Sequence, residues 1–359
     1  MAPEGSQIVP PNCWGKIDGG SGDKMNFEQF IGQEKIKKAL KEIVQQKKLS
    51  HAYMFEGLDG MGKATLSKIF IQAVLCEDTS DSPCGKCQSC IKFSSGNHPD
   101  FFTVSPKALS IGIDEIRKLQ DDIIIKPIES EKKVYLIEQA DKMTEQAQNC
   151  LLKTLEEPPG DSLLILCVKN AGAMLRTIQS RCVSIKFEAY KTEEIEAVLR
   201  KHNISNEESL GFASAFSQGV LGKAFLLVSD EFMQVREDIL NFLSSIYGSR
   251  IENIIKTSSY FETKKDIIGE IFDIISSWYR DLAVCKASGN ERLLINFDKK
   301  DIILKNIENY SEQDIVRIVK KIEEARRDIK RNVNLPMVLD NMLIGFWEVV
   351  NGKGCRSAV

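Results

Sequence analysis

A loop that could bind phosphate stands out between residues 57 and 65. Gly57, Gly62 and Lys63 have the G-x4-G-K spacing, an apolar run precedes them, and a helical pattern follows. This strand–loop–helix context is what such a motif requires. Glycines let backbone N–H groups curl around phosphate oxygens, and the start of a helix adds positive potential. We therefore expect this loop to cradle phosphate groups, with Lys63 reaching the terminal ones.

Two groups that nucleotide hydrolysis needs are missing from the sequence. Ala64 stands where a Ser or Thr hydroxyl would bind Mg²⁺, and Thr65 comes one residue late, about 100° further around a helix. A later apolar run ends in Glu138-Gln139 where a hydrolysing enzyme has Asp-Glu. Glu138 is one methylene too long for the metal-assisting Asp, and without a general base a reaction slows by about 10²–10⁴-fold. We interpret the loop, with Thr65, as a vestigial phosphate site. We interpret the later run as the second strand of the same nucleotide site; the alternative is that this run is only a core strand.

Four cysteines within a short stretch could hold a metal ion. Cys76, Cys84, Cys87 and Cys90 have the spacing C-x7-C-x2-C-x2-C. Four thiolates fill every position of a tetrahedral zinc ion, so we predict a structural Zn²⁺ site without an open position for a substrate. An iron–sulfur cluster is one alternative, although Ser94 stands where a ferredoxin-like run would have its next cysteine. A metal-free cluster is another.

Arg181 is a candidate for chemistry at a subunit boundary. It lies between a predicted helix that ends near Gln179 and an apolar run over 183–187. An arginine exposed at such an edge could reach a phosphate bound by a neighbouring subunit, where it would contribute about 10³–10⁵ in rate. Alternatively, it faces the C-terminal dipole of its helix. On residue chemistry alone, the second interpretation is favoured.

The elements that must position these residues alternate between strands and helices. Several strands are continuous apolar runs, as expected for a parallel sheet covered on both faces. Helical patterns are seen over 27–49 and over 144–156, where two prolines end the helix. We predict a doubly wound α/β domain over 25–188, with the cysteine module inserted at 76–98. The predicted strands are Ala52–Phe55, Phe101–Val104, Val134–Ile137, Leu163–Val168 and Val183–Phe187.

After about residue 189 the pattern becomes entirely helical. A small helical domain is predicted over 189–229, and a domain of longer helices over 230–350. We expect tails at 1–24 and 351–359. The first tail is expected to be disordered or to have been appended before a native start at Met25. The alternative is that it is a natural flexible tail. The predicted helices include Thr192–His202, Asn206–Ser217, Leu221–Val228, an apolar stripe from Ile267 to Leu282, Glu312–Lys330 and Leu335–Val350, with a loop at Asn290–Asn296.

Length and charge limit the classes of function. A chain of 359 residues favours two or three domains. The net charge of −3 gives no global basic surface, which disfavours a stand-alone zinc module that binds nucleic acid. No apolar run approaches membrane-spanning length, and no apolar signal core is seen, so we expect a cytoplasmic protein.

The motifs occur in an order that resembles a known family. The segment 32–34, the segment 51–53, the phosphate loop, the cysteine module and His98-Pro99-Asp100 come first. Leu-Leu-Lys-Thr-Leu-Glu-Glu-Pro-Pro at 151–159 and Ser180-Arg181-Cys182 follow. From about residue 26 to 350 the chain resembles the clamp-loader subunits of bacterial DNA polymerase III, in particular the delta-prime type.

The resemblance implies an AAA+ module with a zinc insertion, a small helical lid, and a helical collar that joins five subunits into a ring. It implies gamma/tau and delta subunits as partners through the collar, and the sliding clamp and primed DNA as partners through the complex, with no membrane partner. The complex belongs to the DNA polymerase III holoenzyme, a DNA-directed DNA polymerase of DNA replication. Gamma/tau subunits of this family hydrolyse ATP, whereas delta-prime is a stator that does not. Its Ser-Arg-Cys arginine, here Arg181, is offered to the ATP site of the adjacent subunit.

Departures from the motor subunits favour the non-hydrolysing type. Gamma/tau subunits keep Ser or Thr after the loop lysine and Asp-Glu in the later strand, where this chain has Ala64, Glu138 and Gln139. Their sensor arginine corresponds to Gly222. Because the glycines and lysine of the loop are retained, weak binding of ATP or ADP stays open. A gamma/tau-type motor that uses Thr65 or Glu138 as a substitute metal ligand is the alternative.

Overall fold

The computed structural model describes residues 26–78, 82–106, 110–202, 204 and 206–352. Contacts divide this part of the chain into two compact units. The sheet unit comprises residues 26–202 and Gln218–Lys223, and the helical unit comprises residues 204–217 and 224–352. The predicted tail over 1–24 lies outside the described residues, as do residues 353–359, whereas Asn351 ends the last helix.

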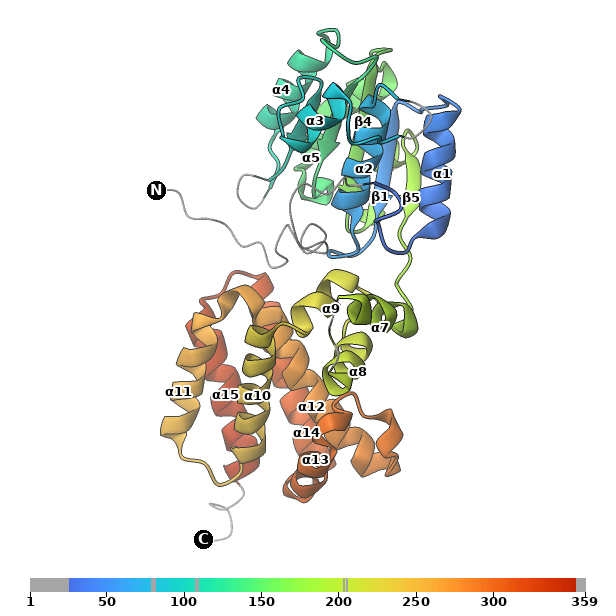
Figure 1. The fold of residues 1–359 in the computed structure, drawn as a ribbon. Helices are drawn as coiled ribbons and strands as arrows, with labels where there is room; N and C mark the ends of the chain where they lie inside the picture. Colours follow the sequence, from blue (N-terminus) through green and yellow to red (C-terminus); the bar gives the residue numbers. More distant parts are fainter. Residues whose placement is uncertain (1–25, 79–81, 107–109, 203, 205, 353–359) are drawn as a thin grey trace. The chain divides into compact units, whose positions relative to one another are not determined.

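Five parallel strands form the centre of the sheet unit, in the order β2-β3-β4-β1-β5 (Figure 1). All five predicted strands are present. Three of them are one residue longer than predicted and β5 is one shorter. The bounds are β1 Ala52–Glu56, β2 Phe101–Val104, β3 Lys133–Ile137, β4 Ser162–Val168 and β5 Val183–Lys186.

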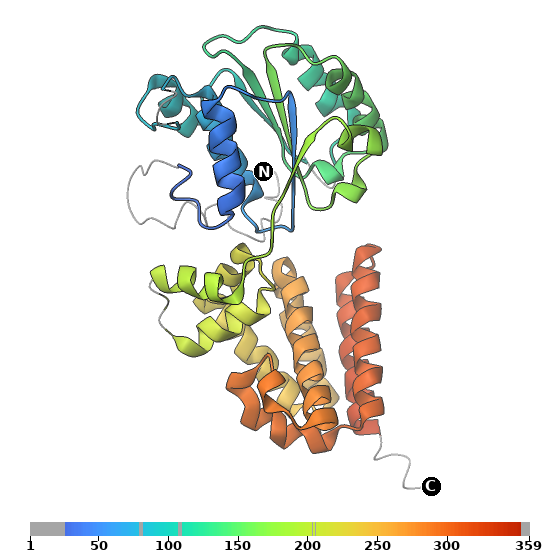
Figure 2. The same cartoon turned by 90° about the vertical axis from the view of Figure 1, so that its right-hand side faces the viewer.

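Two apolar cores lie on opposite faces of this sheet, because successive side chains of a strand point to opposite sides. Tyr53 and Phe55 of β1 join one core, whereas Ala52 and Met54 join the other. Helices cover both faces, as predicted for a doubly wound domain (Figure 2). They are α1 Glu34–Gln45, α2 Lys63–Leu75, α3 Gln88–Ser94, α4 Ile113–Ile123, α5 Glu145–Glu156 and α6 Arg176–Gln179, with the 3₁₀ turns η1 Ala140–Lys142 and η2 Ala171–Ala173.

Two details of the sheet unit differ from the sequence-based expectation. The helix predicted over 27–49 is shorter, because Gln33 (φ 52°) precedes α1 and Lys47 (φ 53°) follows it. Left-handed backbone at both positions limits the helix. Strand β5 is the edge of the sheet and is not continuously buried; Val183 is 44% exposed.

Three short helices follow the sheet, close to their predicted bounds. They are α7 Thr192–Lys201, α8 Glu207–Phe216 and α9 Leu221–Leu227. Helix α7 belongs to the sheet unit and α8 to the helical unit, while the first residues of α9 pack with the sheet unit. A separate lid over 189–229 and a collar domain over 230–350 stay predictions.

The helical unit is built around α12, whose apolar stripe is buried as predicted. Ile271, Ile274, Trp278 and Leu282 are fully buried on this helix. The predicted loop over 290–296 contains one 3₁₀ turn. The bounds are α10 Asp230–Ser245, α11 Ile251–Thr263, η3 Lys265–Ile267, α12 Ile268–Ser288, η4 Glu291–Leu293, η5 Phe297–Lys299, α13 Lys300–Asn306, η6 Ile307–Asn309, α14 Glu312–Lys330 and α15 Leu335–Asn351.

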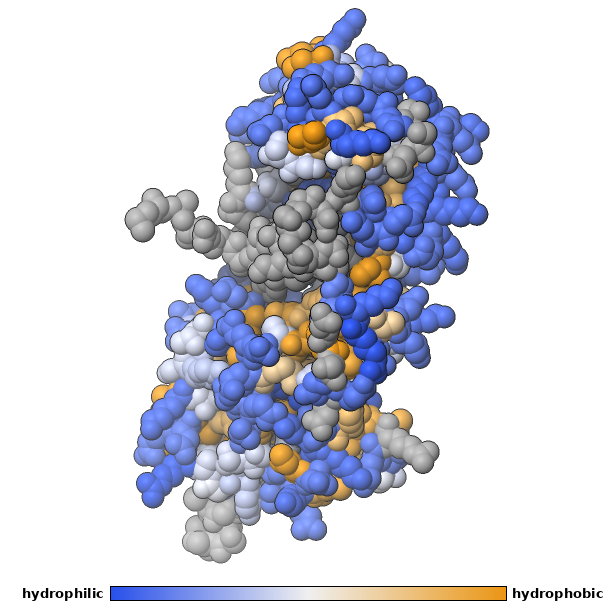
Figure 3. All heavy atoms as spheres, in the orientation of Figure 1, coloured by the Kyte–Doolittle hydropathy of each residue, from blue (hydrophilic) through white to orange (hydrophobic). Residues whose placement is uncertain are grey.

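Hydrophilic residues dominate the face of the molecule shown in Figure 3, with apolar residues scattered among them. Among the described residues, no helix combines the length and the apolarity needed to cross a bilayer.

Candidate functional site

The predicted phosphate loop lies at the carboxyl end of β1 and leads directly into α2. Its glycines are required by geometry. Gly62 precedes α2 with φ 85°, a left-handed backbone conformation that residues other than glycine rarely adopt. A Cβ on Gly57 would lie 2.9 Å from the Cβ of Phe187. The structure therefore requires glycine at both of these positions, and phosphate binding by the loop stays a prediction.

Lys63 is satisfied by its own loop. Its Nζ donates to the carbonyl oxygens of Gly57 at 2.5 Å and Leu58 at 2.8 Å, and it lies 3.7 Å from the Asp59 carboxylate. The side chain is almost fully buried. Burial lowers the pKa of Lys63, and the nearby Asp59 charge counters part of that effect. A phosphate group would have to replace these carbonyl partners.

The residues that replace the metal-binding and water-activating groups of a hydrolysing enzyme have structural surroundings of their own. Glu138 forms an ion pair with Lys68, 3.1 Å between Oε1 and Nζ. Gln139 adopts left-handed backbone (φ 51°) and precedes η1. Ala64 and Thr65 are half-buried in the first turn of α2. Thr65 as a phosphate ligand stays a prediction.

A contact that the sequence did not predict joins the loop to the start of α9. The Gly222 N–H donates to the Gly60 carbonyl at 2.9 Å. A Cβ on Gly222 would lie 2.9 Å from that oxygen, and a Cβ on Gly60 would lie 2.9 Å from Cγ1 of Val220. Any side chain at position 222 would therefore press on the backbone of the phosphate loop.

Lys169 is a further residue that sequence reasoning missed. It follows β4, and its Nζ lies 3.5 Å from the Asp59 carboxylate while its N–H donates to Asp141 at 3.0 Å. The charge directly after a buried apolar strand was the available signal, because the carboxyl ends of parallel strands share one edge.

The four predicted cysteines come together. The sulfur atoms of Cys76, Cys84, Cys87 and Cys90 lie within 4.8 Å of one another, and the Cys76 and Cys87 sulfurs are 4.0 Å apart. Tetrahedral zinc with Zn–S bonds of about 2.3 Å needs sulfurs about 3.8 Å apart. Burial raises the pKa of Cys76 to about 11, whereas backbone donors outweigh burial at Cys84 and lower its pKa to about 7. The donor set fits a tetrahedral metal ion.

Hydrogen bonds connect the cysteine module to a loop beyond α4. Ser89 donates to the Leu75 carbonyl at 2.6 Å, and its Oγ lies 3.0 Å from Nε2 of His98. Nδ1 of His98 accepts from the Asp100 N–H at 3.1 Å, which assigns the ring proton to Nε2. Burial lowers the pKa of His98, so the ring is neutral.

Asp100 completes this connection. Its buried carboxylate accepts three backbone N–H groups, those of Ile128 at 2.6 Å, Glu129 at 2.9 Å and Ser130 at 2.8 Å. Burial raises the pKa of Asp100, but the three donors outweigh it, and the pKa lies below its usual value. The backbone of 128–130 is thereby fixed to the start of β2.

Arg181 lies between α6 and β5, where the sequence placed it. Its Nη2 is 2.9 Å from Oε1 of Glu156, and its Nη1 donates to the Thr177 carbonyl at 2.9 Å. The side chain is about one-third exposed. The contact with Thr177 is the helix-end interaction considered as the alternative.

The sheet separates Arg181 from the phosphate loop of its own chain. Strands β1 and β5 are parallel, with Tyr53 opposite Val183. The loop follows the carboxyl end of β1, whereas Arg181 precedes the amino end of β5. Four paired residues at about 3.3 Å each separate the two edges. Arg181 and the predicted phosphate loop therefore lie at opposite edges of the sheet.

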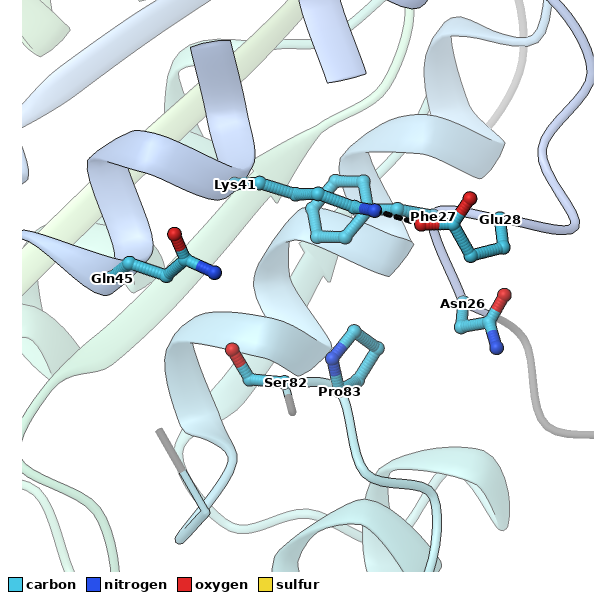
Figure 4. Close-up of a pocket in the computed structure, with 7 residues that line it drawn as sticks. All are labelled: Asn26, Phe27, Glu28, Lys41, Gln45, Ser82 and Pro83. Atoms are coloured by element: carbon cyan, nitrogen blue, oxygen red, sulfur yellow. Dashed lines mark hydrogen bonds and ion pairs between the residues drawn. The ribbon is translucent and has the colours of Figure 1, made fainter. Parts of the chain in front are cut away.

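A separate pocket lies beside α1, near the start of the cysteine module (Figure 4). Lys41 extends over the ring of Phe27, with Nζ 5.8 Å from its centroid, and pairs with Glu28. Among the described residues that line the pocket, Lys41 and Glu28 neutralise each other, so these residues offer no unmatched charge for a ligand. Its lining residues are Asn26, Phe27, Glu28, Lys41, Gln45, Ser82 and Pro83.

The family models and the curated relatives that match this chain are subunits of DNA polymerase III. Residues 32–191 match the family model described as DNA polymerase III, delta subunit, and residues 230–348 match DNA polymerase III, delta subunit, C terminal. DNA polymerase III subunit delta′ of Bacillus subtilis is 30% identical over 88% of this chain and 96% of its own. Subunit tau of the same organism is 28% identical over 92% of this chain and 62% of its own. A gamma subunit-related structure from Thermotoga maritima covers 87% of this chain and 99% of its own at 18% identity, with a TM-score of 0.46, too low to carry an argument.

Proposed function

This chain belongs to the family of DNA polymerase III clamp-loader subunits that includes delta′ and gamma/tau proteins, and we propose that it serves there as a delta′-type stator. In this role it does not hydrolyse ATP. It supports ATP-dependent loading of the sliding clamp on primed DNA during replication. It also lends Arg181 to the ATP site of a neighbouring subunit.

The observation that carries the proposal is the separation of Arg181 from the phosphate loop across one parallel sheet. The loop follows the carboxyl end of β1, and Arg181 precedes the amino end of β5. An arginine at that edge cannot serve its own loop, but it can serve a nucleotide bound by another subunit. In such a position it would stabilise the charge that develops on a transferred phosphoryl group.

The loop itself supports a non-hydrolysing role. Ala64 has no hydroxyl for Mg²⁺, and Gln139 cannot act as a general base. The Gly222 backbone lies against Gly60, so a sensor arginine at position 222 would not fit without movement. ATP or ADP, if bound at all, would bind weakly through Gly57, Gly62 and Lys63.

The helical unit is the proposed contact with gamma/tau and delta subunits. Large apolar side chains remain exposed on three of its helices, including Ile255 on α11, Val316 on α14 and Met337 on α15. Subunit interfaces are marked by contiguous patches of exposed apolar groups, and we propose that these side chains contribute to such patches. The sliding clamp and primed DNA would be met through the complex, in the cytoplasm, as part of the DNA polymerase III holoenzyme.

The metal proposed for Cys76, Cys84, Cys87 and Cys90 is structural Zn²⁺. Four sulfur ligands leave no position for a substrate. Zinc would therefore hold the module around α3 and supply no catalytic group.

A gamma/tau-type motor is the second candidate. One observation favours it: the loop keeps the glycines of the motif, and its lysine is buried beside them. The similarity to tau covers as much of this chain as the similarity to delta′. Turnover by the purified chain would favour this candidate.

The experiment that tests the stator proposal is Arg181→Ala in an assembled loader. The ATP site beside this chain should lose about 10³-fold or more of its rate, and total ATPase should fall by the share of that site. Arg176→Ala, an exposed arginine of the preceding helix, is the matched control and should change nothing. Unchanged ATPase with Arg181→Ala would remove the role in trans.

A further inference from the structure

The guanidinium of Arg181 already has partners at the edge that would meet a phosphate. Nη2 lies 2.9 Å from the Glu156 carboxylate, and Nη1 donates to the Thr177 carbonyl at 2.9 Å. These two nitrogens form the edge that binds carboxylates and phosphates in pairs of parallel hydrogen bonds. To bind a phosphate in this way, Arg181 must leave Glu156.

Glu156 occupies a position that is unfavourable for its own helix. It is the last residue of α5, where the helix dipole presents its negative end and disfavours an acidic side chain. The side chain is about half exposed, so it fills no core position. The ion pair with Arg181 is the contact that offsets this placement.

We propose that Glu156 is a positioning residue that holds Arg181 in reserve, and that the phosphate groups of the neighbour's nucleotide displace it. Carboxylate and phosphate compete for one guanidinium edge, and the phosphate carries more negative charge. This inference rests on the proposed role of Arg181 in trans. It assigns Glu156 the function of keeping the arginine folded back until a charged nucleotide is present.

The solvent exposure of the Glu156–Arg181 ion pair is consistent with an interaction that a bound nucleotide can displace reversibly. Exposed ion pairs shift an equilibrium by at most about fivefold, so a bound nucleotide can displace the carboxylate. A fully buried pair would resist displacement, because an unpaired buried charge is strongly unfavourable. The two side chains are 34% and 48% exposed, which places them in the first class.

Removing the charge of Glu156 should change the KM for ATP at the neighbour's site more than kcat. If Glu156 reduces the fraction of chains whose arginine is available, removing its charge should lower the KM for ATP at the neighbour's site. Glu156→Gln should lower that KM about two- to fivefold, with kcat unchanged. A merely structural role for Glu156 would reduce kcat or destabilise the chain instead.

The test uses a loader in which only the ATP site beside this chain is active. Linking the neighbouring subunits in one polypeptide, and substituting the loop lysines of the others, isolates that site. Glu156→Gln, Arg181→Ala and the double variant are compared with Glu157→Gln. The last variant removes the same charge one residue further on and should leave KM unchanged.

The outcomes separate this inference from its premise. The double variant should behave as Arg181→Ala alone, because no arginine remains to be released. If Arg181→Ala lowers kcat but Glu156→Gln leaves KM unchanged or lowers kcat, the hold by Glu156 is wrong and the role in trans stands. If Arg181→Ala has no effect, the role in trans fails and this inference fails with it. Glu156→Ala serves as a second variant for the same comparison.

Discussion

Several charged side chains at the proposed sites are paired within their own chain. Lys63 donates to carbonyl oxygens of its loop, Glu138 pairs with Lys68, and Arg181 pairs with Glu156. Each would act on a nucleotide only after exchanging its present partner. At the scale of the residue, the charged side chains proposed to meet a nucleotide all have partners within their own chain.

Asp100 gives a prediction about stability and pH. Its folded pKa lies below the usual value of 3.8, so the unfolded chain binds more protons as the pH falls through this range. The stabilisation is therefore fully present above about pH 4 and is lost progressively as the pH falls through the folded pKa. Asp100→Asn should reduce the free energy of unfolding by about 2–3 kcal/mol at pH 7, because one charged acceptor of three N–H groups is lost.

Urea unfolding at pH 7 and pH 3 measures this effect. The difference between the wild-type chain and Asp100→Asn should be largest at pH 7 and smaller at pH 3. Asp161→Asn, on an exposed side chain, is the control. A difference that does not change with pH would contradict the assigned role of the carboxylate.

Gly222 gives a second prediction at this scale. A Cβ there would lie 2.9 Å from the Gly60 oxygen and 3.0 Å from its Cα, both backbone atoms that move together with the loop. Gly222→Ala should therefore destabilise the sheet unit by about 1–3 kcal/mol. Thermal unfolding measures it, with Gly269→Ala as control, because nothing lies within 4 Å of a Cβ at that exposed helical position. Equal unfolding temperatures for Gly222→Ala and the wild-type chain would argue against a close contact.

Some of these residues could be predicted and others could not, for a physical reason. The cysteine cluster was predictable because all four ligands lie within fifteen residues, so their spacing records their geometry. The pairs Arg181–Glu156 and Gly222–Gly60 join segments far apart in the chain. Sequence spacing holds no record of such contacts, although Glu156 and Arg181 each lie in a motif that the sequence made prominent.

Between elements, the cysteine module is linked to the backbone of 128–130. The links run from Ser89 through His98 to Asp100, and an ion pair joins Lys92 of α3 to Glu129. Metal bound by the four cysteines would fix the position of α3, and α3 carries Ser89 and Lys92, which make these contacts. The module therefore supports a segment beyond its own boundaries.

Metal removal should loosen both segments together. Chelation under reducing conditions should speed amide hydrogen exchange over 82–98 and at 128–130, while α14 stays protected. The purified chain should contain one zinc ion, which Cys90→Ser should lose and Cys150→Ser, outside the cluster, should retain. Iron with labile sulfide, or a chain that binds no metal, would contradict the zinc assignment.

The elements themselves were the most predictable level. Strands β3 and β4 are buried along their whole length, and apart from their first residues, Lys133 and Ser162, their sequences are unbroken apolar runs. Helix α14 matches its predicted bounds. The error at α1 arose because Gln33 and Lys47 adopt left-handed backbone, which no apolar pattern records. Strand β5 is exposed because it lies at the edge of the sheet. The sequence of a single strand does not determine its position in the strand order, so this exposure could not be predicted.

At the scale of the whole molecule, the chain combines a doubly wound α/β unit with a separate helical unit. In the proposed ring, the helical unit would join neighbours while the sheet unit presents Arg181. In the proposed role the chain does not hydrolyse ATP, so its contribution to ATP turnover would be made at a neighbour's site. The molecule would then act as a scaffold that completes another subunit.

The most direct test is ATP hydrolysis by the purified chain, free of other clamp-loader subunits, in the presence of Mg²⁺. The account predicts no ADP release above the background of a Lys63→Ala variant prepared in the same way. Steady release of ADP that disappears in Lys63→Ala would show a working motor and would contradict the account.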